Sequence, residues 1–402
     1  MKRIVFVDDE PKVLEGLQRM LRSRRHQWHM VFVTSGAAAL QALAENAFDV
    51  IVTDVRMPEM DGVQLLQHVQ QRFPGVIRIV LSGYFEREAA LEAAGVAHQY
   101  LAKPCDPGKL CEAIDRLCHS TGILKDEDAR RVVSAIGSLP SLPGTCASLV
   151  AALQRPDVGL EEIGRIIQQD VSMTAKVLQL VNSRLFGLVC EITTVQTAVG
   201  RLGLDTLRQL VLSVEIFRTF EPESPIHGFA LEEFQDHCRL TAKIAARLPA
   251  PDAVVPVAVM AALLHDIGKL VLAVRLPGQF EKAIQAARLA GKPLYCMEED
   301  SVGANHAEIG AYLLSLWGLP EAIIDAVSRH HRPETGSVPG GGLDVLAVTH
   351  IADALAWEVA AAGDDVDGMA PWNRDYLAAL GVADRIDEWR IMARRIAQSQ
   401  GF

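Results

Sequence analysis

The stretch that decides the fold of the N-terminal part is residues 49–62, DVIVTDVRMPEMDG. Residues 50–53 are a β-branched run without polar alternation, which predicts a strand covered on both faces of a parallel sheet. A proline and a glycine then break the pattern, and Asp61 is placed to cap the helix that follows. We therefore expect Asp54 at the carboxyl end of a strand, where open α/β sheets bind their ligands.

Four more short apolar runs, separated by segments of helical periodicity, predict strands at residues 3–7, 31–34, 77–81 and 97–101. Five such βα units predict a doubly wound, five-stranded parallel sheet. Polar side chains end four of the strands and are expected to converge on one edge of the sheet: Asp8 and Asp9, Asp54, Ser82, and Lys103.

This edge of the predicted sheet can carry a specific chemistry. Clustered carboxylates bind a hard dication such as Mg²⁺, which prefers oxygen ligands. Asp54 can then act as a nucleophile that forms an aspartyl phosphate, while Lys103 and the Ser82 hydroxyl contact the phosphoryl oxygens. Each acid taken alone is more simply explained as a solvated loop residue, but the combination favours a phosphoacceptor site.

About the first 120 residues resemble the receiver domain of two-component response regulators, a flavodoxin-like fold. The resemblance rests on Asp8-Asp9, on Asp54 followed by Met57-Pro58 and Asp61-Gly62, on Ser82-Gly83, and on Tyr100 with Lys103-Pro104. It implies that Asp54 accepts a phosphoryl group from a sensor histidine kinase or a phosphotransfer protein.

The same resemblance implies roles for the neighbouring residues. The Mg²⁺ ligands would be Asp9, Asp54 and the backbone carbonyl of Arg56, with Asp8 as a supporting acid. Ser82 and Tyr100 would be the pair that reports phosphorylation to the surface. The Lys103-Pro104 peptide would be cis.

Length and composition limit the class of protein. At 402 residues the chain can form two or three domains, each with its own core. Seven cysteines without a C-x-x-C pair predict reduced thiols in a cytoplasm. The longest apolar run, residues 253–264, is too short for a bilayer span, which takes about 20 residues. Because no signal peptide precedes the first strand either, we expect a cytoplasmic protein without membrane insertion.

The net charge of −11 is unevenly distributed. Residues 1–120 carry 14 Lys and Arg against 15 Asp and Glu, which leaves 25 against 35 for the rest of the chain. A DNA-reading output domain needs a basic surface that releases counterions from phosphate. The acidic C-terminal part therefore predicts that nucleic acid is not a partner.

Past Cys118 the alternation of strands and helices stops. Residues 121–138 form a polar, partly helical connector, which places the end of the first domain near residue 120. Residues 139–355 have helical periodicity and few strand signals, so we expect an all-α second domain. Residues 356–402 form a C-terminal helical extension with its last helix at residues 385–398.

The second domain contains phrases that resemble the HDOD family, an HD-related output domain of bacterial signalling proteins. The phrases are LPSLP at residues 139–143, QDVSMTAKVL at 169–178, VNS at 181–183 and AVGRLG at 198–203. Asp170 and Ser172 are natural caps for the helix that follows them. The resemblance implies a domain without an established activity, and a structural role is the simplest explanation of these phrases.

Histidines and acids of the second domain follow the order of the metal ligands in HD-superfamily phosphohydrolases, a more distant resemblance. The set is His237, His265, Asp266, His306, His330, His331 and Asp353, with Glu233 as a further oxygen ligand and Lys269 as a candidate phosphate contact. Such ligands suit Fe, Mn or Zn, and a pair of these ions can activate a water for attack on a phosphodiester. The alternative is that these groups hydrogen-bond one another inside a helical bundle.

Two departures from the HD-GYP phosphodiesterases bear on function. Those enzymes have a Gly-Tyr-Pro turn after the paired histidines and basic residues after the last aspartate, whereas residues 334–339 read ETGSVP and residues 354–358 read ALAWE. The departures favour an output domain, controlled by phosphorylation of Asp54, that acts through interaction with downstream signalling proteins. The alternative is a phosphorylation-gated, metal-dependent phosphohydrolase that acts on a cyclic dinucleotide or another nucleotide.

Overall fold

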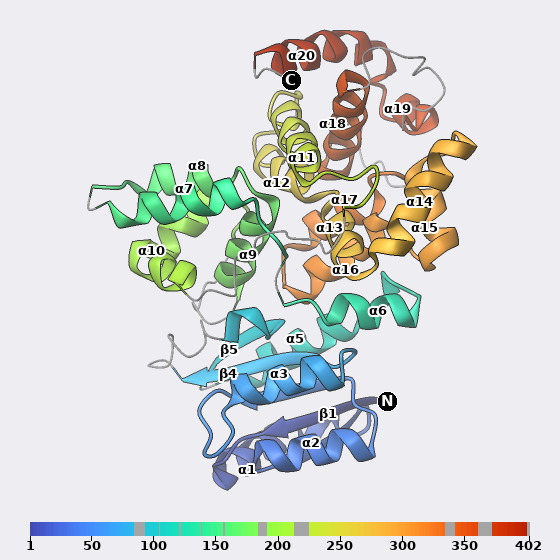
Figure 1. The fold of residues 1–402 in the computed structure, drawn as a ribbon. Helices are drawn as coiled ribbons and strands as arrows, with labels where there is room; N and C mark the ends of the chain where they lie inside the picture. Colours follow the sequence, from blue (N-terminus) through green and yellow to red (C-terminus); the bar gives the residue numbers. More distant parts are fainter. Residues whose placement is uncertain are drawn as a thin grey trace.

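The computed structural model describes residues 1–83, 93–103, 105–119, 122–137, 139–155, 157–183, 191–212, 225–333, 342–360 and 372–399. Its N-terminal part is an α/β domain, and its C-terminal part is built from packed helices (Figure 1). The predicted fold class is therefore confirmed for both parts. The cysteines that these ranges include are free thiols.

The N-terminal domain contains a five-stranded parallel sheet in the order β2-β1-β3-β4-β5. The strands are β1 (Lys2–Val7), β2 (Trp28–Val33), β3 (Val50–Asp54), β4 (Ile77–Gly83) and β5 (Gln99–Lys103), and the flanking helices are α1 (Pro11–Met20), α2 (Gly36–Glu45), α3 (Gly62–Arg72) and α5 (Pro107–His119). Strand β2 starts before residue 31, the predicted start, because Trp28 pairs in register with Lys2 of β1. All five residues of β3 are buried, as expected for a central strand.

The C-terminal part consists of two groups of helices that follow the connector helix α6 (Glu127–Ser134). The first group is α7 (Pro143–Gln154), α8 (Leu160–Ile167), α9 (Val171–Asn182) and α10 (Val195–Leu212). The second is α11 (Leu231–Ala245), α12 (Val255–Leu264), α13 (Ile267–Arg275), α14 (Pro277–Ala290), α15 (Leu294–Val302), α16 (His306–Leu316), α17 (Glu321–Arg329), α18 (Val345–Ala360), α19 (Arg374–Ala379) and α20 (Ile386–Gln398). Figure 1 shows the first group beside the second, with α9 turned towards it.

The start of helix α9 is hydrogen-bonded to the leucine- and proline-rich segment at residues 139–143, which leads into α7. As predicted, Asp170 caps α9, because its carboxylate accepts hydrogen bonds from the backbone nitrogens of Met173 at 2.9 Å and Leu142 at 2.7 Å. The prediction of Ser172 as a cap is wrong. Ser172 lies in the first turn of α9, and its hydroxyl donates to the Pro140 carbonyl at 2.6 Å. These bonds give the phrase a structural role.

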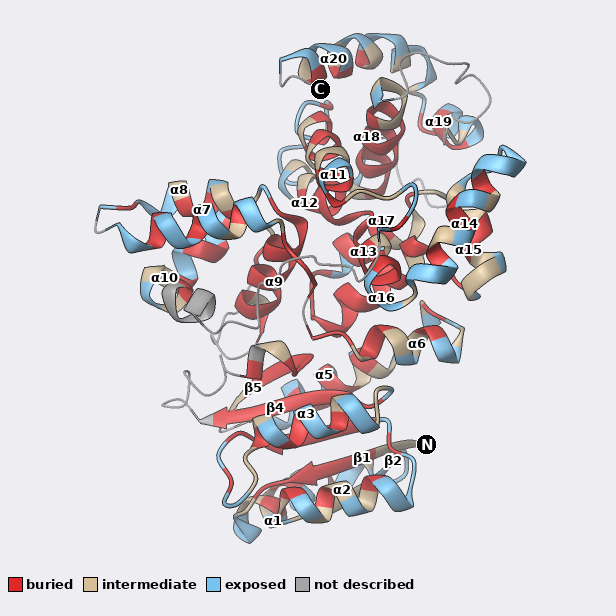
Figure 2. Cartoon of the chain, in the orientation of Figure 1, coloured by how far each residue is buried: buried red, intermediate tan, exposed pale blue. Residues whose placement is uncertain are grey.

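One helical stretch in the described part of the chain, Val255–Arg275, is long and apolar enough to span a membrane by length and composition. It is longer than the apolar run in the sequence because α13 continues after α12. However, 78% of its most apolar window is buried inside the protein, as in a core helix. Figure 2 shows the same burial along α13 and α16.

The two domains meet along β5 and the segment before it. The Gln99 side chain donates a hydrogen bond to the Leu316 carbonyl of α16 at 3.0 Å. From the other side, the Gln179 side chain of α9 donates to the Ala97 and His98 carbonyls at 3.4 and 3.2 Å. The His98 ring also contacts the Ser134 carbonyl of α6 at 2.9 Å. Strand β5 and the two residues before it therefore contact both groups of helices: Gln99 contacts α16, and residues 97–98 contact α9.

Three basic side chains, Arg78, His98 and Lys176, are buried at this contact. The Arg78 guanidinium donates to the Val96 carbonyl at 2.6 Å, and the Lys176 amine donates to the Gly137 carbonyl at 2.8 Å. Burial lowers the pKa of Arg78 to about 9 and that of Lys176 to about 7. Burying these cations against carbonyl groups therefore opposes formation of this contact by a desolvation cost, which the hydrogen bonds offset in part.

Lys176 should therefore make stability depend on pH. The pKa of this amine is lowered from 10.5 to about 7 by burial first and by Arg78 second. Between these values the unfolded chain binds the extra proton, so the free energy of unfolding should rise from pH 7 to pH 9. We expect Lys176→Met to reduce this rise by up to about 1 kcal/mol per pH unit, as measured by urea unfolding. The exposed Lys282→Met is the matched control, and equal slopes in all three proteins would contradict the prediction.

Candidate functional sites

The predicted edge of the sheet brings together an acidic pair and a lysine. Asp8 follows β1, Asp54 ends β3, and Lys103 ends β5. The Lys103 amine lies 2.7 Å from Asp8 Oδ2 and 2.5 Å from Asp54 Oδ1. Asp8 and Asp54 are buried, whereas the adjacent Asp9 is half-buried. In this geometry a cationic side chain, Lys103, contacts Asp54 and the carboxylate of Asp8, which follows another strand.

Electrostatics keep Lys103 charged at this edge. Burial alone would lower the pKa of its amine, but hydrogen bonds and charge attraction from Asp54 and Asp8 outweigh burial and raise that pKa. The ammonium group therefore offsets the repulsion between the two carboxylates. An arriving phosphoryl group would meet a fixed positive charge next to Asp54.

The loop after β3 holds Asp54 through close backbone packing. Asp61 Oδ1 accepts from the backbone nitrogen of Gln64 at 2.8 Å, and the Gln64 side chain accepts from the backbone nitrogen of Asp61 at 3.2 Å, which forms a capping box for α3. A Cβ atom on Gly62 would lie 2.0 Å from the Asp54 carbonyl oxygen. The Asp-Gly pair is therefore required by the position of the strand end. Arg56 lies in this loop with an exposed side chain.

The predicted switch residues are both buried. Ser82 lies in β4 and is fully buried. The Tyr100 ring is also fully buried, and its hydroxyl donates to the Ala93 carbonyl at 2.8 Å. Burial raises the pKa of Tyr100, so the phenol stays neutral and can donate. The prediction of a cis Lys103-Pro104 peptide concerns a proline outside the described residues.

The second site is a cluster of histidines and aspartates in the second group of helices. Its members come from five places: His237 on α11, His265 and Asp266 between α12 and α13, His306 at the start of α16, His330 and His331 after α17, and Asp353 on α18. Their side-chain nitrogens and oxygens form two groups, each within 4.8 Å: Asp266, His306, His330 and His331, and His237, His265 and Asp353. The fold thus brings together residues that are up to 116 positions apart.

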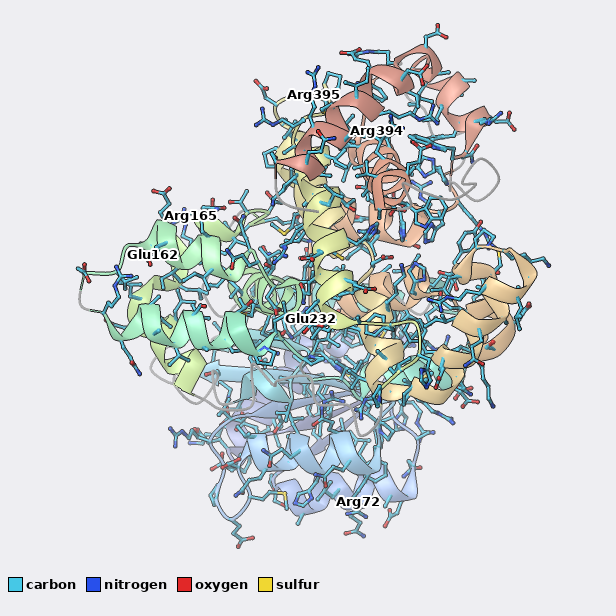
Figure 3. The ribbon with its side chains drawn as sticks, turned by 45° about the horizontal axis from the view of Figure 1, so that its top comes forward. Arg72, Glu162, Arg165, Glu232, Arg394 and Arg395 are labelled. Atoms are coloured by element: carbon cyan, nitrogen blue, oxygen red, sulfur yellow. The ribbon has the colours of Figure 1, made fainter. Side chains whose placement is uncertain are left out.

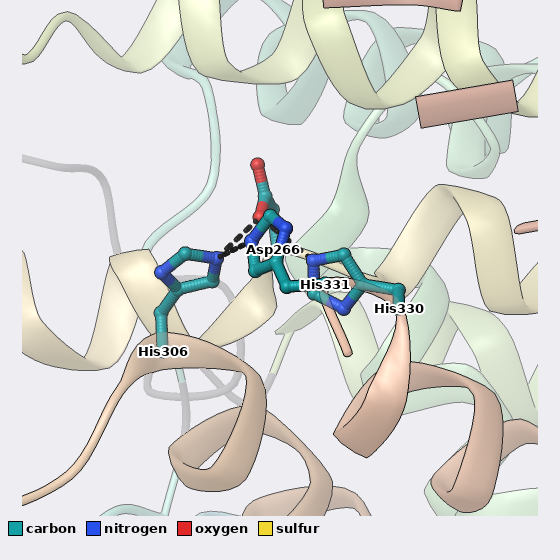
Figure 4. A group of neighbouring side chains, drawn as sticks. All are labelled: Asp266, His306, His330 and His331. Atoms are coloured by element: carbon teal, nitrogen blue, oxygen red, sulfur yellow. Dashed lines mark hydrogen bonds and ion pairs between the residues drawn. The ribbon is translucent and has the colours of Figure 1, made fainter. Parts of the chain in front are cut away.

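In the first of these two ligand groups, the His306 ring lies close to Asp266 and His331 (Figure 4). Its Nε2 lies 3.1 Å from Asp266 Oδ1 and 2.8 Å from His331 Nε2. His330 Nε2 lies 3.8 Å from the same Asp266 oxygen. His330 Nε2 and His331 Nδ1 are buried without a hydrogen-bond partner in the described structure. Buried ring nitrogens without partners are unusual, and they fit a metal ion.

In the second group, one Asp353 oxygen lies between two rings. Asp353 Oδ1 is 3.1 Å from His237 Nε2 and 3.3 Å from His265 Nε2. The second oxygen of Asp266 lies 3.4 Å from His265 Nε2. Asp266 therefore faces the first group with Oδ1 and the second group with Oδ2, as a carboxylate that bridges two metal ions would.

The outer nitrogen of three rings is already engaged. The Nδ1 atoms of His265 and His330 lie 2.7 Å from the carbonyls of Ala262 and Val327, respectively. His306 Nδ1 lies 2.6 Å from Glu298 Oε2. Because each Nδ1 faces an acceptor, the proton of a neutral ring resides there, and the Nε2 lone pair points into the cluster. This arrangement is the one that metal-binding histidines need.

The charges of the cluster also suit a cation. Burial would lower the pKa of His265, but Asp266 and Asp353 raise it to about 10. In contrast, burial and neighbouring His265 lower the pKa of His330 to about 3, so that ring is neutral. Although burial would raise them, the pKa values of both aspartates are held well below normal by the surrounding cations. A metal ion would supply the positive charge that the His265 proton supplies here.

Three further acids and bases have distinct positions. Lys269 Nζ lies 2.5 Å from Asp266 Oδ2, so its predicted role as a phosphate contact would require it to leave that carboxylate. Glu233 is exposed and belongs to neither group. Glu298, which sequence reasoning missed, is fully buried and accepts from both the backbone nitrogen and Nδ1 of His306. In the sequence, the one feature that could have pointed to Glu298 is its position eight residues before His306.

Comparison with known domain families finds one match in each of the two parts of the chain. Residues 4–115 match the response regulator receiver domain, and residues 139–333 match the HDOD domain. An uncharacterized protein of Treponema pallidum (strain Nichols) is 28% identical over 206 residues, which cover 50% of this chain and 39% of that protein. The hydrogenase transcriptional regulatory protein HoxA of Cupriavidus necator is 32% identical over 126 residues, 31% of this chain and 25% of HoxA. The chain thus spans less than half the length of either relative.

Two solved structures are similar to parts of the chain. The MmoQ response regulator of Methylococcus capsulatus str. Bath is 23% identical, with a TM-score of 0.49, over 60% of this chain and 98% of MmoQ. The signal receiver domain of an HD domain-containing protein from Pseudomonas fluorescens Pf-5 is 29% identical, with a TM-score of 0.27, over 29% of this chain and 92% of that domain.

Proposed function

Because this chain is a two-component response regulator that joins a receiver domain to an HDOD domain, we propose that phosphorylation of Asp54 controls which proteins its HDOD domain binds. One observation carries this proposal. Strand β5 ends with Lys103, which contacts Asp54, and begins with Gln99, which contacts α16 of the HDOD domain. A change at the phosphoacceptor therefore has a direct route to the output domain.

The phosphoryl transfer uses groups at the sheet edge. An Asp54 carboxylate oxygen forms a bond to phosphorus as the bond between phosphorus and a histidine nitrogen of the kinase or phosphotransfer protein breaks. Mg²⁺ fits the oxygen donors of Asp8, Asp9 and Asp54 and the Arg56 carbonyl, and when bound it neutralises phosphoryl oxygens. Lys103 holds a further phosphoryl oxygen through its ammonium group.

The new charge then changes contacts around β5. A phosphoryl group adds about −1.5 to −2 charges, which draws Lys103 and the Ser82 hydroxyl towards it. Tyr100 lies in the same strand as Lys103, and its hydroxyl donates a hydrogen bond to the Ala93 carbonyl. The short turn Ala93–Gly95 packs directly on the connector, because a Cβ on Gly137 would lie 1.6 Å from the Gly95 carbonyl oxygen. Repacking of Tyr100 would thus disturb the contact between domains.

The surface of the HDOD domain suits a protein partner. Acidic and basic side chains lie together on its helix α8, as Glu162 and Arg165 do, and α20 of the C-terminal extension beside it presents Arg394 and Arg395 (Figure 3). The chain beyond residue 120 has 25 basic against 35 acidic residues. Nucleic acid binds to surfaces with concentrated positive charge, so a surface of this kind does not favour nucleic-acid binding.

A second candidate function is a metal-dependent phosphohydrolase that acts on a phosphodiester such as a cyclic dinucleotide. The observation in its favour is the position of Asp266 between two groups of ligands suited to Fe, Mn or Zn. Against it, the residues after Asp353 are apolar and buried within α18 at positions 354–356, so that segment offers no basic contact for phosphate. Residues 334–339, which replace the Gly-Tyr-Pro turn, lie outside the described residues.

Hydrogen exchange of the full chain tests the proposed function. Phosphorylation with a small phosphodonor and Mg²⁺ should change exchange on both sides of residue 120, including α9 and α16, because both helices contact the segment that holds β5. The unphosphorylatable Asp54→Asn protein under the same conditions is the control. A change confined to residues 1–118 would mean that the two domains act independently, and the proposal would be wrong.

A further inference from the structure

Helix α16 has one end at the histidine cluster and the other at the receiver domain. Its first residue is His306, whose Nε2 lies 3.1 Å from Asp266 Oδ1. Its last residue is Leu316, whose carbonyl accepts the hydrogen bond from Gln99. The last carbonyls of a helix have no partner within the helix, so Gln99 of the receiver caps α16. The helix spans about 16 Å between these contacts.

The position of Gln99 depends on a glycine beyond the end of α16. Gly318 has a left-handed φ of 72° and turns the chain after the helix. A Cβ atom there would lie 2.2 Å from Gln99 Nε2. The absence of a side chain at Gly318 therefore lets Gln99 reach the end of the helix.

Helix α13 makes a second connection between the same regions. Asp266 directly precedes α13, and Arg275 is its last residue. The Arg275 guanidinium donates to the Ala135 carbonyl of the connector at 2.8 Å. The same oxygen accepts from the Gln70 side chain of receiver helix α3 at 2.9 Å. Receiver and output domains thus share one acceptor at this point.

Helices α13 and α16 pack backbone against backbone at Gly268. A Cβ atom on Gly268 of α13 would lie 2.0 Å from the His306 carbonyl oxygen and 2.8 Å from the Gly310 nitrogen of α16. The backbones are therefore in contact, with no side chain between them that could adjust. Closely packed interiors have low compressibility and transmit displacements, so we expect α13 and α16 to move together.

We propose that α13 and α16 act as one rigid unit that relays the phosphorylation state of Asp54 to the histidine cluster and changes the affinity of that cluster for a transition-metal ion. The inference rests on the proposed function, because it requires phosphorylation to move β5. When β5 shifts, Gln99 releases or pulls the end of α16, and the unit carries His306 and Asp266 together. Both residues then change their positions relative to His330 and His331 after α17 and Asp353 on α18. Asp266 and His306 thus receive the signal through the two helices that hold them.

Co²⁺ binding to the full chain, followed by visible absorption, tests the relay. Excess Mg²⁺ occupies the receiver acids, and the protein is titrated with and without a small phosphodonor. We expect phosphorylation to shift the Co²⁺ dissociation constant about five-fold or more, the usual size of coupling between two sites. Gln99→Ala should reduce this shift to less than about two-fold, because it removes the cap on α16. Hydrogen exchange of His306–Leu316 gives a second readout that needs no metal.

Gln179→Ala is the matched control. It also removes a glutamine hydrogen bond between the HDOD domain and the segment at the start of β5, but it acts on α9 and leaves α16 untouched. It should keep the shift of the wild-type protein. If the wild-type HDOD domain does not respond to phosphorylation at all, the proposed function itself fails. If the wild type responds and Gln99→Ala responds equally, or if Gln179→Ala loses the response as well, only the relay through α16 is overturned.

Discussion

Replacement of Asp54 by asparagine should abolish covalent labelling of the full chain by a small phosphodonor with Mg²⁺. The amide has nearly the shape of the carboxylate but lacks the anionic oxygen that attacks phosphorus. Lys103 keeps its contact with Asp8 in this variant, so we expect the cleft to stay folded. Labelling is measured by intact-protein mass, where phosphorylation adds one phosphoryl group.

Asp61→Asn is the matched control for that experiment. It makes the same chemical change in the loop after β3, and asparagine caps a helix as well as aspartate does. This variant should be labelled like the wild type. Undiminished labelling of Asp54→Asn would show that another residue is the phosphoacceptor.

Replacement of His265 and Asp266 by alanine should remove bound transition metal from the purified protein. The reason is the position of Asp266, which faces one ligand group with each of its oxygens, while His265 completes the second group. We expect the wild type, purified under reducing and metal-replete conditions, to hold at least one Fe, Mn or Zn ion per chain by elemental analysis. The exposed His227→Ala should retain it. Metal-free wild-type protein would leave the histidines as a purely hydrogen-bonded cluster.

A second variant separates loss of metal from loss of fold. His237 belongs only to the second ligand group, with His265 and Asp353, and is partly exposed. His237→Ala should therefore lower metal content without emptying the first ligand group, and circular dichroism should show the helical content of the wild type. Equal metal content in His237→Ala and the wild type would argue against a second ion.

The same proteins decide whether the cluster turns over a phosphodiester. We expect hydrolysis of a cyclic dinucleotide to be absent or very slow, because α18 continues after Asp353 with buried apolar residues where phosphate contacts would be needed. Robust turnover that disappears in the double alanine variant would instead make the protein a phosphorylation-gated phosphodiesterase.

Much of the receiver fold was predictable because its signals are local. A β-branched run such as residues 50–53 predicts a central strand, and Asp61 predicts the start of α3, from a few neighbouring residues. The parallel order then places the ends of the strands on one edge, and so Asp54 and Lys103 meet. The start of β2 at Trp28 could not be predicted from its neighbouring residues, because it depends on pairing with Lys2 of β1.

The order of histidines and aspartates in the chain resembles that of the HD-superfamily ligands, and this resemblance was enough to predict which residues gather in the cluster, except for Glu233. Their division into two groups with Asp266 between them could not be predicted from the sequence, since it depends on the angles at which five separate helical segments pack. Glu298 was missed for the same reason. An isolated acid in α15 gains its role only when α15 places it against His306.

By itself, the sequence determined the order of the five strands along the chain, the helix caps at Asp61 and Asp170 and the chemistry of the two sets of polar residues, since these follow from local periodicity and residue type. The tertiary structure alone decided how the domains meet. It buried Arg78, His98 and Lys176 at their contact and placed Gln99 on the end of α16. The physical reason is that contacts between domains depend on which faces dock, and residues far apart in the chain determine that choice together.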